Sequence, residues 1–292
     1  MAVNEAAPGS YYRPIEAPAG DPPAGGEHGY EYFQPTEGTI SVWSPRLQHG
    51  GPPSGLLTRA MSRLVGDGDG QAFSRITVDI LGAVGLDVNR VRAWVARPGR
   101  QISLVAAELE VRGTDGTYRA AARASAWRLR ASDSSAVQAL PQPPLTPLPD
   151  ELPQATGFPE LGGEAVPWGR IGFIGTLSVA SVPSRNGGTP PAFWLRPQLP
   201  LVAGERATDL ESAMTVLDVA NGVGTTLDPR RWSWMNTDTT VHLVRQPAGP
   251  WLGVDADMAA GADGYAASLT DVYDLTGFLG RSAQTALLSA QG

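Results

Sequence analysis

The chain has 292 residues, of which 42% are hydrophobic and 17% charged, and its formal net charge at pH 7 is −7. This is enough apolar material for about two domains with buried cores, which excludes a globally disordered chain. The acidic balance argues against nucleic acid as a partner, because nucleic-acid binders carry a basic stripe. The chain has no cysteine, so disulfides, a thiolate nucleophile and thiolate metal sites are excluded as well.

Residues 1–27 are dominated by Ala, Pro and Gly and are expected to form a flexible leader. They lack the basic start and apolar run of a signal peptide, and the chain has no stretch of roughly 18 apolar residues that could span a membrane. The three histidines, His28, His49 and His242, are too few and too scattered for a metal cage. We therefore expect a cytoplasmic protein with no metal, no cofactor and no membrane partner.

Residues 28–130 are expected to form the first folded unit. Short strand signals between residues 30 and 43 lead into a helix, whose apolar residues recur at helical spacing through residues 54–65. Pro52 and Pro53 suit the start of that helix, where a missing N–H is not needed. The turns that follow are too short for parallel crossovers, so the later strands should pair antiparallel. We expect these strands at residues 73–81, 87–96, 100–111 and 117–130.

A second unit follows a linker and repeats the same plan. Residues 131–166 contain seven prolines and little periodicity, which predicts a semi-rigid linker. Thr240 follows Thr77 by 163 positions and Gly277 follows Gly116 by 161, and so nearly constant an offset indicates an internal duplication. The elements expected within residues 167–292 are strands at 171–182 and 192–198, a helix at about 209–222, and strands at 232–245, 251–259, 262–274 and 278–289.

One helix wrapped by a long antiparallel sheet is the hotdog arrangement, an α+β fold. We expect two such units in tandem, each half a long antiparallel sheet around one central helix. A single unit would leave a sheet edge exposed, and pairing the two halves would cover it. Clefts should then form where the helix of one half meets the strands of the other. Such a cleft can hold a long apolar chain beside a polar reaction site.

Six short segments carry a resemblance to a known family through their order and spacing. They are QHGGPP at 48–53, RPGR at 97–100, RASAWRLR at 123–130, LDVANG at 217–222, NTDTTVHL at 236–243 and RSAQ at 281–284. With them the chain resembles the double-hotdog acyl-CoA thioesterases, the medium-chain thioesterase II type and its actinobacterial relatives, from about residue 30 to residue 288. The resemblance implies hydrolysis of an acyl-CoA or a carrier-bound acyl thioester, in fatty acid or polyketide metabolism. It is compatible with a homodimer of double hotdogs.

The members of that family hold and activate water with three side chains: an Asp on the second helix, a Thr or Ser at the start of the next strand, and a Gln on the last strand. By motif, Asp218 matches the helix Asp and Gln284 matches the strand Gln. Counting back from Arg245, the hydroxyl position falls on Asn236, which departs from the family pattern although an amide can still hydrogen-bond a water. The resemblance thus implies Asp218 as the base, with Asn236 and Gln284 positioning the water. The departure leaves open whether the pocket hydrolyses thioesters or serves another reaction.

His49, Gly50 and Gly51 are candidates for substrate binding at the start of the first helix. Glycine lets a ligand approach the backbone, and free N–H groups at a helix start carry a partial positive charge suited to a thioester oxygen. His49 could add a further donor. The plainer interpretation of every candidate is structural: a tight turn before the helix, a helix-edge Asp, and strand amides that bond locally.

Other catalytic patterns are absent from the sequence, including the G-x-S-x-G elbow, the phosphate-binding loop and the H-E-x-x-H zinc helix. Two rivals to hydrolysis remain. One is another reaction in the same fold, the dehydration or cyclisation of a polyketide-type intermediate, and the amide at the hydroxyl position motivates it. The other is the binding of an acyl thioester without catalysis.

Overall fold

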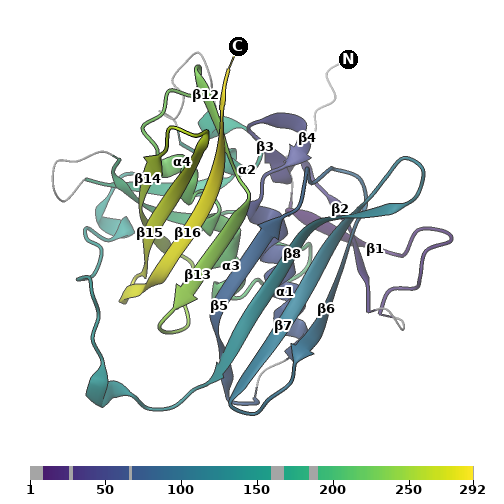
Figure 1. The fold of residues 1–292 in the computed structure, drawn as a ribbon, viewed down its shortest axis with the longest axis horizontal. Coiled ribbons are helices and arrows are strands. Elements are labelled where there is room, and N and C mark those ends of the chain that lie inside the picture. Colours follow the sequence, from purple (N-terminus) through teal and green to yellow (C-terminus); the bar gives the residue numbers. More distant parts are fainter. Residues whose placement is uncertain (1–8, 26–28, 66–67, 159–167, 184–189, 292) are drawn as a thin grey trace.

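A computed structural model describes residues 9–25, 29–65, 68–158, 168–183 and 190–291. Their strands form one continuous sheet of 14 strands, and a separate two-stranded ribbon lies beside it. Neighbouring strands pair antiparallel throughout, and the main helices pack behind the sheet in the view of Figure 1. The expected antiparallel α+β architecture is therefore confirmed.

The first half of the chain contributes six strands and one long helix. Along the sheet the strands lie in the order β1-β2-β6-β7-β8-β5, and α1 (Gly51–Val65) packs against β6, β7 and β8. The ribbon of β3 (Ile40–Ser41) and β4 (Ser44–Gln48) leads into α1. The strands are β1 (Tyr12–Ile15), β2 (Glu31–Pro35), β5 (Gln71–Ile80), β6 (Asn89–Arg97), β7 (Ile102–Arg112) and β8 (Tyr118–Arg130).

The second half repeats this order with its own strands, as β10-β11-β14-β15-β16-β13, and β9 extends the far edge while β12 pairs with the end of β16. The helices are α2 (Gly172–Gly175), α3 (Asp209–Leu217) and α4 (Ala220–Val223). The strands are β9 (Gln154–Thr156), β10 (Leu177–Val182), β11 (Ala192–Pro197), β12 (Trp232–Asn236), β13 (Asp238–Leu243), β14 (Leu252–Ala260), β15 (Tyr265–Asp274) and β16 (Gly277–Ala290).

The two halves meet where β5 pairs with β13. Thr77 lies opposite Thr240 in this pair, and their hydroxyl oxygens are 3.1 Å apart in a hydrogen bond. These are the two residues that the offset of 163 made equivalent. When equivalent residues of two antiparallel strands lie opposite each other, the strands are related by a local two-fold axis. The sheet therefore runs through both halves without an exposed edge between them.

The helices α1 and α3 cross at unusually close range behind that junction. A Cβ atom on Gly51 would lie 2.3 Å from the Thr215 carbonyl oxygen, and one on Gly55 would lie 2.1 Å from the Thr215 hydroxyl. Real Cβ atoms do not approach so closely, so these two positions require glycine. Behind the glycines, Leu56 and Met61 are fully buried in a core that residues of both halves share.

Two segments that were expected to be irregular carry structure. In the expected leader, Tyr11 and Tyr12 are fully buried, β1 pairs with β2, and the Tyr12 hydroxyl donates to Gln48 Oε1 at 2.7 Å. Residues 11–15 of the expected leader are therefore ordered by strand pairing and by the burial of two aromatic side chains, which the Pro- and Gly-rich sequence does not suggest. Residues 1–8 and 26–27 lie outside the described part. In the expected linker, Leu145 is buried and β9 pairs with β10.

Three expected elements are interrupted. The segment 171–182 begins as the short helix α2 before β10, and the segment 232–245 divides at Thr237 into β12 and β13, which both pair with β16. The helix expected over 209–222 divides after Leu217 into α3 and α4. Of the helices that the structure describes, none is long and apolar enough to cross a membrane.

Candidate active site

Asp218 lies at the break between α3 and α4, where it closes the end of α3. The start of α3 is fixed by a capping box, in which the Thr208 hydroxyl accepts from the Glu211 N–H and the Glu211 carboxylate accepts from the Thr208 N–H. Met214 and Leu217 bury the helix against the sheet. Asp218 is carried inward with them and is 2% exposed.

Three side chains hold the Asp218 carboxylate. The Asn236 amide donates to Oδ1 at 2.6 Å, the Thr239 hydroxyl donates to Oδ1 at 3.3 Å, and His49 Nδ1 lies 2.9 Å from Oδ2. Burial raises the pKa of Asp218, but the hydrogen bonds from His49, Asn236 and Thr239 outweigh it, so the pKa lies below its ordinary value. The carboxylate is therefore ionised at neutral pH.

Gln284 joins the group from β16. Its amide nitrogen donates to the Thr239 hydroxyl at 2.8 Å and to the Asp218 carbonyl oxygen at 3.2 Å. The side-chain carbonyl, Gln284 Oε1, is buried and has no hydrogen-bond partner. Gln284 and Thr239 are both 2% exposed. The predicted residues Asp218, Asn236 and Gln284 thus lie together in one hydrogen-bonded cluster.

The first half of the chain completes this cluster through the turn before α1. A Cβ atom on Gly50 would lie 2.7 Å from Asp218 Oδ2, so only glycine lets the turn pass this close. The His49 ring rests against the Phe173 ring at a centroid distance of 4.8 Å. Pro52 and Pro53 have no N–H, so among the first three residues of α1 only Gly51 has one. His49, Gly50 and Gly51 all lie at the cluster, opposite the residues of the second half.

The contacts of the His49 ring bear on which of its two nitrogens carries a proton. A carboxylate can only accept hydrogen bonds, so the 2.9 Å contact with Asp218 Oδ2 requires a proton on His49 Nδ1. The Gly51 N–H points at the same nitrogen and lies 3.2 Å from it. In the neutral ring the other nitrogen, Nε2, carries the free lone pair. The His49 side chain is 13% exposed and that of Asp218 only 1%, so the imidazole is the part of the pair that a ligand can reach.

Thr239 is the residue of the cluster that the sequence reasoning missed. Asn236 does contact the carboxylate, as a residue at the family's hydroxyl position should, but the hydroxyl group itself comes from Thr239, three residues later. The signal that could have found it is the period of two along β13, where Thr239 and Val241 are buried while His242 is exposed. Thr239 therefore faces the helices and not the solvent.

The positions of the first half that correspond to the cluster are apolar. Thr77 corresponds to Thr240, so Ile76 corresponds to Thr239. Thr77 pairs with Ser125 and Thr240 pairs with Ala283, so Ala126 corresponds to Gln284. Ile76 and Ala126 are fully buried in the core. Within the described residues, the polar cluster is therefore formed once per chain and not twice.

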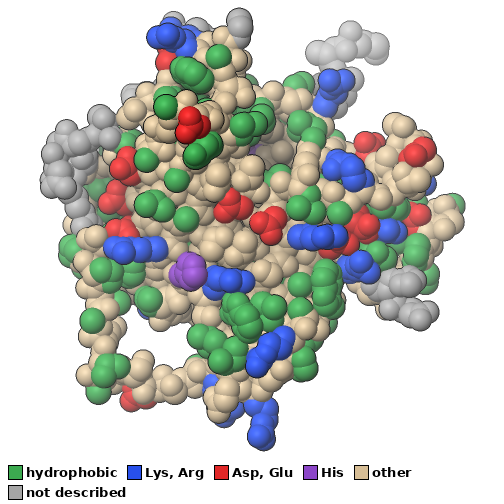
Figure 2. Space-filling model, viewed as in Figure 1, with side chains coloured by type: hydrophobic (Ala, Val, Ile, Leu, Met, Phe, Trp, Pro, Cys, Tyr) green, Lys and Arg blue, Asp and Glu red, His purple; other side chains and the backbone are tan. Residues whose placement is uncertain are grey.

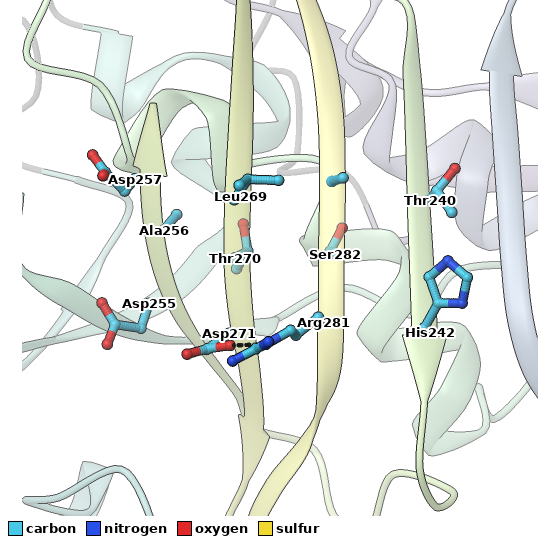
Figure 3. A pocket seen from close by; sticks show the side chains of 11 residues that line it. Thr240, His242, Asp255, Ala256, Asp257, Leu269, Thr270, Asp271, Arg281 and Ser282 are labelled. Carbon is cyan, nitrogen blue, oxygen red and sulfur yellow. Dashed lines mark hydrogen bonds and ion pairs between the residues drawn. The ribbon is translucent and has the colours of Figure 1, made fainter. Parts of the chain in front are cut away.

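The outer face of the second-half sheet also carries a hollow, of about 480 Å³. It contains an ion pair between Arg281 and Asp271 at 2.8 Å, with His242 on the neighbouring strand (Figure 3). Acidic, basic and hydrophobic side chains are interspersed over this face (Figure 2). No residue of the Asp218 cluster lines the hollow, and the helices lie behind its strands in the view of Figure 3. Among the described residues, no group of three or more His, Asp or Glu is placed to hold a metal ion.

The cluster brings together a carboxylate, an imidazole, a hydroxyl and two amides from the two halves of the chain. The family model of the acyl-CoA thioesterase N-terminal domain matches residues 39–129, and that of the C-terminal domain matches residues 149–288. The chain belongs to the acyl-CoA thioesterase family and is a hydrolase of thioester bonds. A comparison with curated proteins finds no match to this sequence.

Solved structures resemble the chain at low sequence identity and so bear on its fold alone. A conserved protein with a hotdog fold from Alicyclobacillus acidocaldarius is 15% identical with a TM-score of 0.66, over 90% of this chain and 94% of its own. An acyl-CoA thioesterase II from Mycobacterium marinum is 14% identical with a TM-score of 0.61, over 90% and 94%. A dehydratase structure from type I polyketide synthases is 13% identical with a TM-score of 0.50, over 94% and 97%. The fold is thus of the hotdog type.

Proposed function

We propose that the chain hydrolyses an acyl thioester, carried by CoA or by a carrier protein, in the cleft where its two halves meet as tandem hotdogs. The single observation that carries the proposal is the Asp218 cluster, which draws His49 and Gly50 from one half and its other members from the other half. The repeated strand order and the pairing of Thr77 with Thr240 support the tandem arrangement.

In the proposed reaction Asp218 activates water through His49. The water oxygen attacks the thioester carbonyl carbon while His49 Nε2 accepts a water proton, and the anionic Asp218 stabilises the imidazolium that forms. Collapse of the tetrahedral intermediate breaks the carbon–sulfur bond, and the proton passes from His49 to the leaving thiolate. General base catalysis of this kind contributes about 10²- to 10⁴-fold. The support for this route is burial, because Asp218 has both oxygens occupied and almost no exposed surface.

Asn236 and Gly51 are proposed to position the reactants. Asn236 is partly exposed beside the carboxylate, so its amide can also hold the attacking water. The Gly51 N–H points at His49 Nδ1 at 3.2 Å, and we propose that the thioester oxygen competes with that nitrogen for it. A preorganised backbone donor at the start of a 15-residue helix is suited to the negative charge that develops there. Gln284 holds Thr239 and the Asp218 backbone in place.

Dehydration of a 3-hydroxyacyl thioester is the second candidate, and the His49–Asp218 pair is the observation that favours it, since an imidazole and a carboxyl group can serve as base and acid. The acid step, however, needs a proton on the carboxyl group to release the hydroxyl as water. The pKa of Asp218 is lowered by its hydrogen bonds, after the opposing effect of burial, so that proton is missing at neutral pH. Hydrolysis needs no such proton on Asp218 and is therefore the function we put first.

The test follows thiol release from acyl-CoAs of increasing chain length in water enriched in ¹⁸O, with mass spectrometry of the products. Hydrolysis predicts free CoA and an equal amount of carboxylic acid that carries one ¹⁸O atom. Loss of 18 mass units from an intact 3-hydroxyacyl thioester would establish dehydration instead. Stoichiometric binding of acyl-CoA without thiol release would show a binding protein and refute the proposal.

A further inference from the structure

Three hydroxyl groups on the inner face of the second-half sheet are buried without any hydrogen-bond partner. They belong to Ser268 and Thr270 on β15 and to Ser282 on β16, and these residues are 0%, 4% and 4% exposed. The carbonyl oxygen of Gln284 has no partner either. Such groups give up their hydrogen bonds to water on folding and gain none in return, so each of them opposes folding. Alanine or valine could fill the same space without that penalty.

The four residues form one patch. Ser268 lies opposite Gln284, and Thr270 lies opposite Ser282, in the antiparallel pairing of β15 with β16. Residues two apart along a strand face the same side, and these four are buried while Leu269, Arg281 and Ala283 between them are exposed, so all four side chains point away from the solvent-exposed face. Figure 3 shows Thr270 and Ser282 side by side on their neighbouring strands. Across the neighbouring strands, Ala256 lies opposite Thr270 and Met258 opposite Ser268 on β14, and Val241 lies opposite Ser282 on β13.

This patch begins at the reaction centre. Gln284 donates to Thr239, which in turn donates to Asp218. From Gln284 the patch extends by one more pair of residues along the strands, which is about 7 Å. That is the span of the first few carbons of an acyl group whose carbonyl sits beside Asp218 and His49. The short helix α4 packs over β14 and β15 in this region. An acyl group reaches the hydroxyls if the C-terminal end of α4, away from Asp218, moves aside.

We propose that Ser268, Thr270, Ser282 and Gln284 form the acyl-binding surface and select an acyl group that carries hydroxyl or keto oxygens near its thioester, over a plain saturated chain. This specificity rests on the proposed function, because it assumes that the thioester is placed at Asp218. Unpaired buried polar groups that cluster at a reaction centre are explained when the ligand supplies their partners. A saturated chain would leave them unpaired.

The test compares 3-hydroxydecanoyl-CoA with decanoyl-CoA by kcat/KM in thiol release. Two neutral hydrogen bonds correspond to about tenfold, so we expect the wild type to prefer the hydroxylated substrate by at least about tenfold. In the triple variant Ser268→Ala, Thr270→Val, Ser282→Ala the preference should fall to about one while the midpoint of thermal unfolding rises. The control is Thr285→Val on the exposed side of β16, which should leave the preference unchanged.

Equal rates on both substrates in the wild type, or a preference that survives in the triple variant, would overturn the inference. A lower midpoint of unfolding in the triple variant would overturn it too, because the hydroxyls would then be paired. If the wild type releases no thiol from either substrate, the proposed hydrolysis is refuted. Calorimetry on the wild type and the triple variant then gives the dissociation constants of the two acyl-CoAs, and their ratio tests the specificity. A tenfold ratio that the triple variant abolishes supports the patch, and a ratio near one refutes it.

Discussion

Replacing Asp218 by asparagine changes one atom of the cluster and leaves its shape. Asn236 and Thr239 both donate to Oδ1, so the new side chain keeps its oxygen on that side. Its amide nitrogen then takes the place of Oδ2 and faces His49 Nδ1 at about the present 2.9 Å. Two N–H groups cannot face each other at that distance. His49 must therefore move its proton to Nε2, which removes the lone pair that is proposed to accept a proton from water.

We expect Asp218→Asn to lower kcat strongly and to change the free energy of unfolding little. The same exchange in a Ser-His-Asp triad lowers kcat by about 10⁴-fold through the wrong tautomer, and we expect a loss of about 10³- to 10⁴-fold here. Hydrogen bonds to a charged group contribute about 1.5–3 kcal/mol each, but the variant is relieved of the cost of burying a charge. The two effects oppose each other, so the free energy of unfolding should change by no more than about 2 kcal/mol.

The assay is thiol release from the best acyl-CoA substrate, with folded protein quantified by circular dichroism. Asp274→Asn is the matched control, because Asp274 is another buried carboxylate, 1% exposed, bound by Arg245 at the end of β15, where it pairs with Gly277. That variant should lose stability while it keeps its activity per folded molecule. If Asp218→Asn retained more than about a tenth of the wild-type kcat/KM, the reasoning about the tautomer would be refuted.

Three further predictions concern the same cluster. His49→Gln should lower kcat by about 10²- to 10⁴-fold in the thiol-release assay, whereas His242→Gln on the outer face should not, and equal effects of the two would contradict the role of His49. Gly50→Ala places a Cβ atom 2.7 Å from Asp218 Oδ2, so it should displace the carboxylate and reduce kcat/KM at least tenfold. The control Gly222→Ala, whose Cβ meets no atom within 4 Å, should leave kcat/KM within about twofold of the wild-type value. The lowered pKa of Asp218 stabilises the folded chain above the unfolded carboxyl pKa of about 3.9, and this contribution is lost as the pH falls through the folded pKa. Between pH 7 and pH 3, the free energy of urea unfolding should therefore fall more for the wild type than for Asp218→Asn. If the wild type and the variant differ by the same amount at both pH values, the lowered pKa is contradicted.

Much of the fold could be predicted from the sequence because its strands are long and its turns short. The last strand of the first half was expected at residues 117–130 and is Tyr118–Arg130 in the structure. The register of the two halves was also accessible, since Thr77 and Thr240 were equated by their offset and lie opposite each other. The predictions that differed from the structure concerned the segments rich in Pro and Gly. Tyr11 and Tyr12 are held by burial and distant partners, which local composition does not reveal.

Part of the candidate site was predicted from the sequence, and the residues that were found and those that were missed differ in how they could be recognised. Asp218, Asn236 and Gln284 came from the resemblance to a family, and the structure brings them into one cluster. Thr239 was missed because only its place in the strand and its contact with Gln284 distinguish it from the threonines beside it. The contact between His49 and Asp218 joins the two halves of the chain, and no local pattern or spacing could have shown it.

The most direct test of the account is the position of the proton on the His49 ring, measured by ¹⁵N NMR of histidine-labelled protein at neutral pH. The chain has three histidines, so His49→Gln identifies the signal. The account predicts a proton on Nδ1 in the wild type, held by Asp218, and its transfer to Nε2 in Asp218→Asn. A wild-type ring protonated on Nε2 and bare at Nδ1 would contradict the proposed activation of water.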